Sequence, residues 1–180
     1  MLEKTQKTLQ YLKSDGFKRY DFQQNAGQQT LICCADKEHA TTAFQTEYDM
    51  LQRLEGKGFV KTVDLVTTEH PISITLAAEE GILLSQYIQN QSPSIETLLE
   101  LAIQLSDILG ELIQKGIVHQ HIAPENFLYQ KANASVQLFD CQYAYDIEVN
   151  TSKKELPLND LRLLNYISPE QSGRINRKID

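Results

Sequence analysis

A long amphipathic segment runs directly into a short polar loop, and together they limit the folds open to this chain. Apolar residues recur at helical spacing between Ser92 and Gly116, which predicts one helix with a long buried face. We expect Ser92 to cap this helix, Pro93 to lie in its first turn and Gly116 to end it. The predicted buried face consists of Ile95, Leu98, Leu99, Ala102, Leu105, Leu109, Leu112 and Ile113.

The loop that follows the helix reads G-I-V-H-Q-H-I-A-P-E-N from Gly116 to Asn126. Two short apolar runs come next, F-L-Y at 127–129 and S-V-Q-L-F at 135–139. They predict the two strands of a small hairpin that carries Asp140, fourteen residues beyond Asn126. The loop and Asp140 together form the candidate functional site of the chain.

The first part of the chain has the pattern of an antiparallel sheet. Residues 17–22 and 29–35 predict two strands, and the turn at 25–27 reads N-A-G, whose Asn and Gly tolerate the positive φ of a tight hairpin. Two further strands are predicted within 60–68 and 72–78, the second from its alternation of apolar and small polar residues.

A helix is predicted between these two pairs of strands, within residues 37–55. Phe44, Tyr48, Leu51 and Leu54 would form its apolar face, and two glycines follow it. Residues 1–14 are expected to form a short helix or an irregular lead-in. A short helical piece is also expected around 83–88, just before the long helix.

The composition of the chain limits the kinds of partner that we expect it to bind. The net charge of −7 argues against a nucleic-acid or anionic-membrane surface, because such binding needs clustered Lys and Arg. The three cysteines lack zinc or disulfide spacing, which indicates a reducing, cytoplasmic setting. No run approaches the roughly 20 apolar residues that a membrane span needs, so we expect no membrane insertion.

The loop resembles the catalytic loop of protein kinases, which reads H-R-D-L-K-P-E-N and is followed by a D-F-G triplet. His119 matches the first His, residues 124–126 match P-E-N, and Asp140 matches the Asp of D-F-G. In the family, the His fixes the loop backbone, whereas the Asn and the Asp hold magnesium. The strand and helix order of residues 17–78 is also similar to a kinase small lobe.

The departures from the kinase pattern fall on catalytic positions. His121 stands where the family has its catalytic Asp, Gln120 replaces an Arg, Ala123 replaces a Lys, and residues 141–142 read C-Q instead of F-G. A neutral imidazole could accept a proton in place of the carboxylate, so His121 is a candidate catalytic base. Its larger ring and its repulsion from magnesium when protonated argue against this role.

The phosphate-binding parts of the family are also incomplete. A Gly-rich loop is expected between residues 17 and 29, but Gly27 fits a hairpin turn better than a phosphate cradle. The strand Lys of the family falls on Cys33 or Cys34, which we expect to be small core residues. Its helix partner is present as Glu47, which is either that partner or an ordinary helix-face carboxylate.

The resemblance also implies a nucleotide site with Mg-ATP as its cofactor. Its candidate residues are Glu47, Asn126, Asp140 and the pair Ala78 and Glu79 at the connection between the lobes, with Asn126 and Asp140 on the metal. The alternative is that Asn126 ties the loop backbone together and Asp140 caps a turn.

The residues at the end of the chain indicate which group of kinase-like proteins the chain resembles. From Tyr166 it reads Y-I-S-P-E-Q-S-G-R-I-N-R, similar to the Y-I-S-P-E-Q-T-G-R-M-N-R of very large bacterial, notably cyanobacterial, signalling proteins. There a serine/threonine-kinase-like N-terminal domain precedes an ATPase module, a GAF domain and a sensor histidine kinase. Those proteins usually carry H-K-D-I-N-P-S-N, so His121 departs even from them. The S-P-E segment also disfavours a small-molecule phosphotransferase of the aminoglycoside-kinase type.

The resemblance implies a kinase domain that stops at Asp180, before the further large-lobe helices and the partner of Glu170. Exposed apolar surface and self-association through the incomplete large lobe are therefore expected. The predicted fold is α+β and protein kinase-like, with a lead-in at 1–16, a small lobe at 17–78, and a partial, mainly helical large lobe at 79–180.

Three functions follow from these expectations. The leading hypothesis is a degenerate kinase-fold module, a pseudokinase, that contacts other signalling domains or proteins and could still bind nucleotide. The alternative is an active serine/threonine kinase with His121 as its base. The third is an interaction scaffold that binds no ligand.

Overall fold

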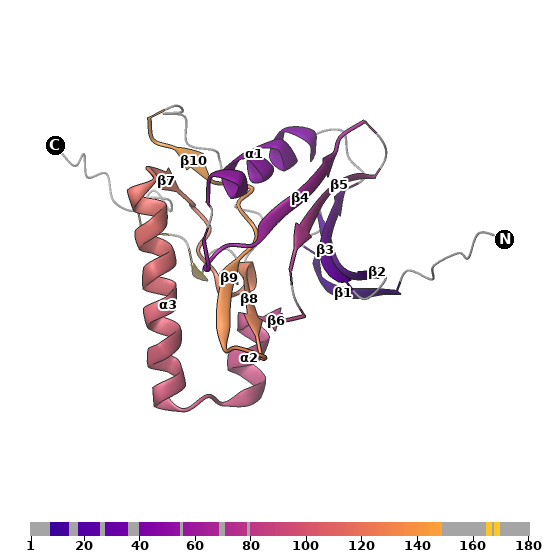
Figure 1. Ribbon diagram of the computed structural model, residues 1–180. Helices are drawn as coiled ribbons and strands as arrows, with labels where there is room; N and C mark the ends of the chain where they lie inside the picture. Colours follow the sequence, from indigo (N-terminus) through magenta and orange to yellow (C-terminus); the bar gives the residue numbers. More distant parts are fainter. Residues whose placement is uncertain are drawn as a thin grey trace.

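The computed structural model describes residues 8–14, 18–25, 28–35, 40–54, 56–68, 71–78, 80–148, 165–166 and 168–169. A five-stranded antiparallel sheet with helix α1 above it forms one part of the molecule (Figure 1). Helices α2 and α3 and two small sheets form the other part, with the long helix α3 along its outer side. The predicted α+β fold class, a small antiparallel lobe followed by a second lobe, is confirmed.

The large sheet has the strand order β1-β2-β3-β5-β4, and every neighbouring pair is antiparallel. The predicted hairpin between the second and third strands is confirmed by the pairing of Asn25 with Gln28, while Gly27 itself lies outside the described residues. The strands are β1 (Thr8–Ser14), β2 (Arg19–Asn25), β3 (Gln28–Ala35), β4 (Lys61–Val66) and β5 (Ile72–Ala77).

Strand β1 corrects the expectation for the N-terminus. Residues 8–14 are the first strand of the sheet and not a helix or lead-in, because they pair with β2 along its whole length. Three strands therefore precede helix α1 (Ala40–Arg53), where the sequence predicted two. The first connection of the sheet is then residues 15–18, so the expected place of the Gly-rich loop, between 17 and 29, is wrong.

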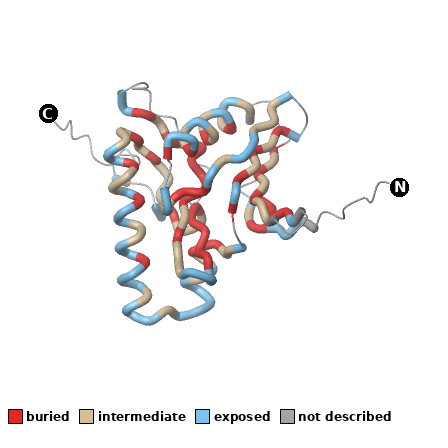
Figure 2. Tube along the Cα trace, viewed as in Figure 1, coloured by how far each residue is buried: buried red, intermediate tan, exposed pale blue. Residues whose placement is uncertain are grey.

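Helix α1 packs its predicted face on the sheet, with Phe44, Leu51 and Leu54 buried. The segment after it pairs with the second lobe, because the amide of Val60 donates to the carbonyl of Leu138 (3.0 Å). The two lobes therefore share one continuous core, visible as the buried residues at the centre of Figure 2.

Gly58 lies at this crossing in contact with α3. A Cβ atom at Gly58 would overlap Cγ1 of Ile108 and lie 3.1 Å from its Cδ1. We expect Gly58→Ala to reduce the free energy of unfolding by about 1–3 kcal/mol, because the buried side chain of Ile108 would have to shift to make room for the added Cβ atom. Urea denaturation followed by circular dichroism measures the change.

Two further variants make this prediction specific. In an Ile108→Ala background, Gly58→Ala should cost little, since the overlapping atoms are gone. Gly110→Ala is the matched control, because a Cβ atom there meets nothing within 4 Å. An equal loss from Gly58→Ala in both backgrounds would show that Ile108 is not the cause.

The second lobe begins with β6 (Ile82–Leu83) and α2 (Leu84–Gln91), which confirms the short helix expected around 83–88. The predicted hairpin that leads to Asp140 is confirmed as β8 (Phe127–Gln130) and β9 (Ser135–Leu138). The remaining elements are α3 (Ile95–Gln114), β7 (Ile117–Val118), the 3-10 turn η1 (Pro124–Asn126) and β10 (Tyr145–Asp146).

The start of α3 differs from the prediction. Its N-cap is Ser94, whose Oγ accepts a hydrogen bond from the amide of Thr97 (3.3 Å), whereas Ser92 ends α2 with a positive φ of 44°. A serine stands at both positions, so the sequence alone did not decide between them. Gly116 ends the helix as predicted, with a φ of +65° that favours glycine.

The predicted buried face of α3 is wrong for most of its members. The helix contacts β9 and β7 along one side only, and Leu101, Ile108 and Leu112 are its buried residues. The apolar stripe is wider than the side that the described residues cover, which the spacing cannot reveal. Figure 2 shows most of α3 as exposed. Exposed members of the predicted face are Ile95, Leu98, Leu99, Ala102, Leu109 and Ile113.

No helix in the described part of the chain is long and apolar enough to cross a membrane. The S-P-E segment is described only at Ser168 and Pro169, so Glu170 and the string that follows it lie outside the described residues.

Candidate functional site

The loop after β7 and the end of the β8–β9 hairpin meet as predicted. Asn126 and Asp140 are both buried, and the Phe139 amide donates to the Asn126 carbonyl (3.1 Å). Nδ2 of Asn126 donates to the backbone carbonyl of His121 (2.8 Å), so this side chain does tie the loop together. Oδ1 of Asp140 accepts from the amide of Gln142 (3.3 Å), which is the turn-capping contact expected for it.

His119 is buried and holds the loop to the hairpin. Its Nε2 donates to the backbone carbonyl of Asp140 (2.7 Å), and its Nδ1 accepts from the amide of His121 (3.3 Å). These two contacts fix the neutral ring with the proton on Nε2. Burial lowers the pKa of His119 to about 4, which agrees with that neutral state. The structural role predicted for His119 is confirmed.

A buried lysine that the sequence analysis did not identify lies at the centre of the site. The ammonium of Lys18, just before β2, contacts Oε2 of Glu47, Oη of Tyr20 (2.6 Å) and Oδ1 of Asp140 (3.2 Å). Oη of Tyr20 in turn donates to Oε1 of Glu47 (3.1 Å). Glu47 is therefore an ion-pair partner inside the core and not an ordinary helix-face carboxylate.

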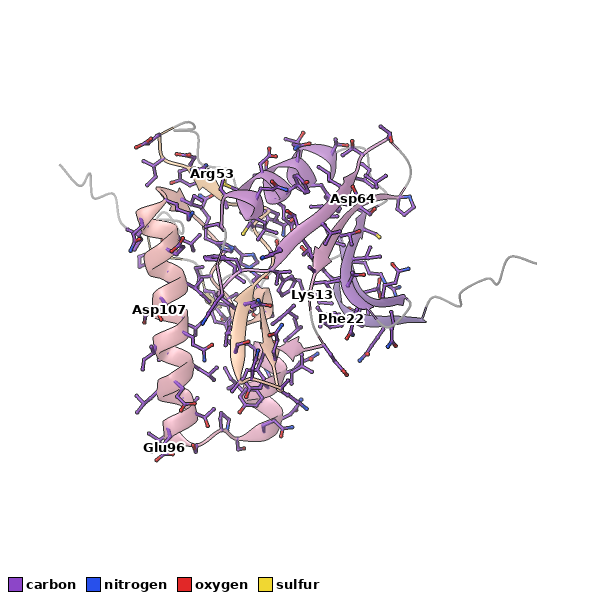
Figure 3. All side chains as sticks on the ribbon, viewed as in Figure 1. Lys13, Phe22, Arg53, Asp64, Glu96 and Asp107 are labelled. Carbon is purple, nitrogen blue, oxygen red and sulfur yellow. The ribbon has the colours of Figure 1, made fainter. Side chains whose placement is uncertain are left out.

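A second lysine reaches the site from β1. Nζ of Lys13 donates to Oδ1 of Asn126 (2.8 Å) and to Oδ2 of Asp140 (3.0 Å). The same ammonium lies 5.0 Å from the ring centroid of Tyr20 and 4.8 Å from that of Phe139. Figure 3 shows Lys13 between the large sheet and the β8–β9 hairpin, so its side chain joins the two lobes.

The pKa values of these groups follow from burial and charge. Burial disfavours the ammonium of Lys18, but Asp140 and Glu47 outweigh it and raise the pKa of Lys18 well above its ordinary value. Burial would raise the pKa of Asp140, yet Lys18 and Lys13 hold it well below its usual range. Burial raises the pKa of Glu47 to about 7 against the opposing charge of Lys18. Asp140 is therefore the firmly charged carboxylate of the site.

The structure places the other predicted residues around this cluster. Cys33 on β3 is buried in the core as expected, whereas Cys34 is half-buried and not a core residue. The amide of Ala78 donates to the carbonyl of Leu76 (3.1 Å), and Glu79 lies outside the described residues. His121 is half-buried, with its ring edge-on to Tyr143 at 5.7 Å between centroids.

Lys13, Lys18 and Tyr20 are the site residues that the sequence analysis missed. The signal for the two lysines was the Asp15-Gly16 dipeptide, which favours a tight hairpin between two strands. A strand before Asp15 would have placed both lysines beside the first connection of the sheet. Lys18, which lies just before β2, thus forms the ion pair with Glu47 that a lysine on β3 would form in the family.

The donor set does not fit the magnesium ion that the resemblance implies. Oδ1 of Asn126 and Oδ2 of Asp140 both already accept from Lys13, and magnesium needs octahedral oxygen ligands at about 2.0–2.1 Å. The rings of Tyr20 and Phe139 also lie within 5.0 Å of the ammonium, and the face of an aromatic ring gives no oxygen ligand to magnesium. No cluster of three or more His, Cys, Asp or Glu among the described residues is placed to hold a metal ion.

Comparison with known proteins shows what the chain is similar to. Residues 19–176 match the model of the family described as protein tyrosine and serine/threonine kinase. The chain is also similar to the serine/threonine-protein kinase nekl-2 of Caenorhabditis elegans, with 23% identity over 155 residues. That match covers 79% of this chain and 42% of the relative, so the chain spans about two fifths of the relative's length.

Proposed function

This chain belongs to the protein tyrosine and serine/threonine kinase family, and we propose that it is a pseudokinase, a module that works through protein contacts without transferring phosphate. The family generally binds Mg-ATP and transfers its terminal phosphoryl group. The proposed setting is intracellular signalling in the cytoplasm, as part of a larger bacterial protein with ATPase, GAF and histidine-kinase modules.

The observation that carries this proposal is the residue at the position of the catalytic base. His121 stands there in place of a carboxylate, and its ring packs against Tyr143. Its backbone carbonyl accepts from Asn126, so the loop is held in one arrangement. Loss of a positioned base lowers a rate by about 10² to 10⁴, and no phosphate-binding glycine motif compensates for it here.

The exposed apolar side of α3 supports the proposed protein contacts. Ile95, Leu99, Ile103 and Ile113 are each more than half exposed on this one helix. Contiguous apolar surface of this kind is typical of interaction sites, including self-association. The proposed function involves contacts with other proteins, and it involves neither nucleic-acid binding nor membrane insertion.

A phosphate-transfer assay tests the proposal. The chain is incubated with Mg²⁺ or Mn²⁺ and ATP labelled on its terminal phosphate, and label is counted on the chain and on added protein substrates. We expect no transfer above the level of the Asp140→Asn variant. Transfer by the wild type that His121→Ala abolishes would overturn the proposal and support the active kinase with His121 as base.

A further inference from the structure

The ammonium of Lys13 occupies the place between two side chains that the family uses to hold its metal. We propose that Lys13 is a built-in substitute for the divalent cation, so that this site is closed without metal and excludes it. This inference deepens the proposed function and rests on it. It takes Asn126 and Asp140 as the metal-holding pair because these residues match the two that hold magnesium in the kinase family.

A β-bulge aims Lys13 into the site. Tyr11 pairs with Asp21 and Lys13 pairs with Tyr20, so Leu12 is an extra residue in β1. In a regular strand, the side chains of Leu12 and Lys13 would point to opposite faces of the sheet. Leu12 is buried and Lys13 still reaches the buried Asp140, because the bulge resets the alternation at this point.

The surroundings of the Lys13 ammonium suit a monovalent organic cation. It has one carboxylate oxygen and one amide oxygen as hydrogen-bond acceptors and two aromatic rings, those of Tyr20 and Phe139, within 5.0 Å. Aromatic faces attract an ammonium group but give no ligand to a hard divalent ion. The site is therefore built for the cation that the chain itself supplies.

The charges of the neighbouring residues also favour the exclusion of a divalent ion. Lys18 contacts the other oxygen of Asp140, so both carboxylate oxygens of this residue already face an ammonium group. A divalent ion that entered beside them would meet two positive charges at close range. Binding of metal would therefore require Lys13 to leave, which would also break its contact between β1 and the second lobe.

Manganese binding in the absence of nucleotide tests the inference. Free Mn²⁺ is measured by its electron paramagnetic resonance signal as the ion is titrated into the purified chain. The wild type should show no saturable site that depends on Asp140. Lys13→Ala should gain one saturable site, and Lys13→Ala/Asp140→Asn should lose it.

The same titration includes a control variant and can give two results that would contradict the inference. Lys61→Ala changes an exposed lysine of β4 and should behave like the wild type. A wild-type site that Asp140→Asn removes would overturn the inference, even if Lys13→Ala fails to fold. A folded Lys13→Ala that gains no site would also overturn it. The titration measures no phosphate transfer. Failure of this inference can therefore be distinguished from failure of the proposed function, which the phosphate-transfer assay tests.

Discussion

Lys18→Met should reduce the free energy of unfolding by about 3–5 kcal/mol, a larger loss than we expect from the other single variants proposed for this chain. The side chain of Lys18 is fully buried and contacts two buried carboxylates, Glu47 and Asp140. Met fills a similar volume but removes the lysine partner of Glu47 and one of the two lysine partners of Asp140, and removing one partner of a buried ion pair leaves an uncompensated charge. Urea denaturation followed by circular dichroism measures the loss.

A double variant separates the charge from the packing. Lys18→Met/Glu47→Gln should recover part of the loss, because the second change removes the carboxylate that Lys18→Met leaves without its lysine partner. Lys61→Met, on the exposed side of β4, should change stability by less than about 0.5 kcal/mol. A loss of under about 1 kcal/mol for Lys18→Met would mean that the buried cluster does not stabilise the fold.

His119→Phe should cost about 2–4 kcal/mol, the second large effect. The ring of His119 is buried, and its Nε2 donates to the Asp140 carbonyl (2.7 Å) while its Nδ1 accepts from the His121 amide (3.3 Å). Phe keeps the volume but leaves the buried Asp140 carbonyl and the half-buried His121 amide without these partners. His119→Gln is the matched variant, since its Nε2 can still donate, and it should lose clearly less than His119→Phe. Equal losses would argue against the hydrogen-bond account.

The same residue makes stability depend on pH. Burial lowers the pKa of His119 from 6.5 to about 4, so between these values the unfolded chain binds more protons than the folded chain. The contribution of His119 is fully present above pH 6.5 and is lost as pH falls toward 4, by about 3 kcal/mol in all. Thermal or urea unfolding at pH 7 and pH 5 should show a steeper decline in the wild type than in His119→Gln.

The second half of the fold followed closely from the sequence. The helix before the loop, its stop at Gly116 and the hairpin that carries Asp140 each had a local signal, either helical spacing or a turn. The loop itself brought His119, Asn126 and Asp140 together as expected. Local patterns were sufficient here because each contact joins elements that are adjacent in the chain.

The lysines were missed because their positions depend on a first strand that was not predicted and on a bulge within it, which no local pattern shows. Lys13 contacts Asn126, 113 residues away, and its side chain points inward only because Leu12 is an extra residue in β1. Lys18 forms the ion pair with Glu47 that the resemblance predicts for a lysine on β3, at the position of Cys33 or Cys34. The exposed side of α3 was missed for another reason, since spacing shows that a face is apolar but not what covers it.

The central claim is that Lys13 of this chain takes the place of a divalent metal in a kinase-family site. The most direct measurement is anomalous X-ray diffraction from crystals of the wild-type chain grown with Mn²⁺ and ATP. We expect continuous density for Lys13 up to Asn126 and Asp140, and no manganese peak between them. A manganese peak bonded to the side-chain oxygens of both residues, with Lys13 displaced, would contradict the account.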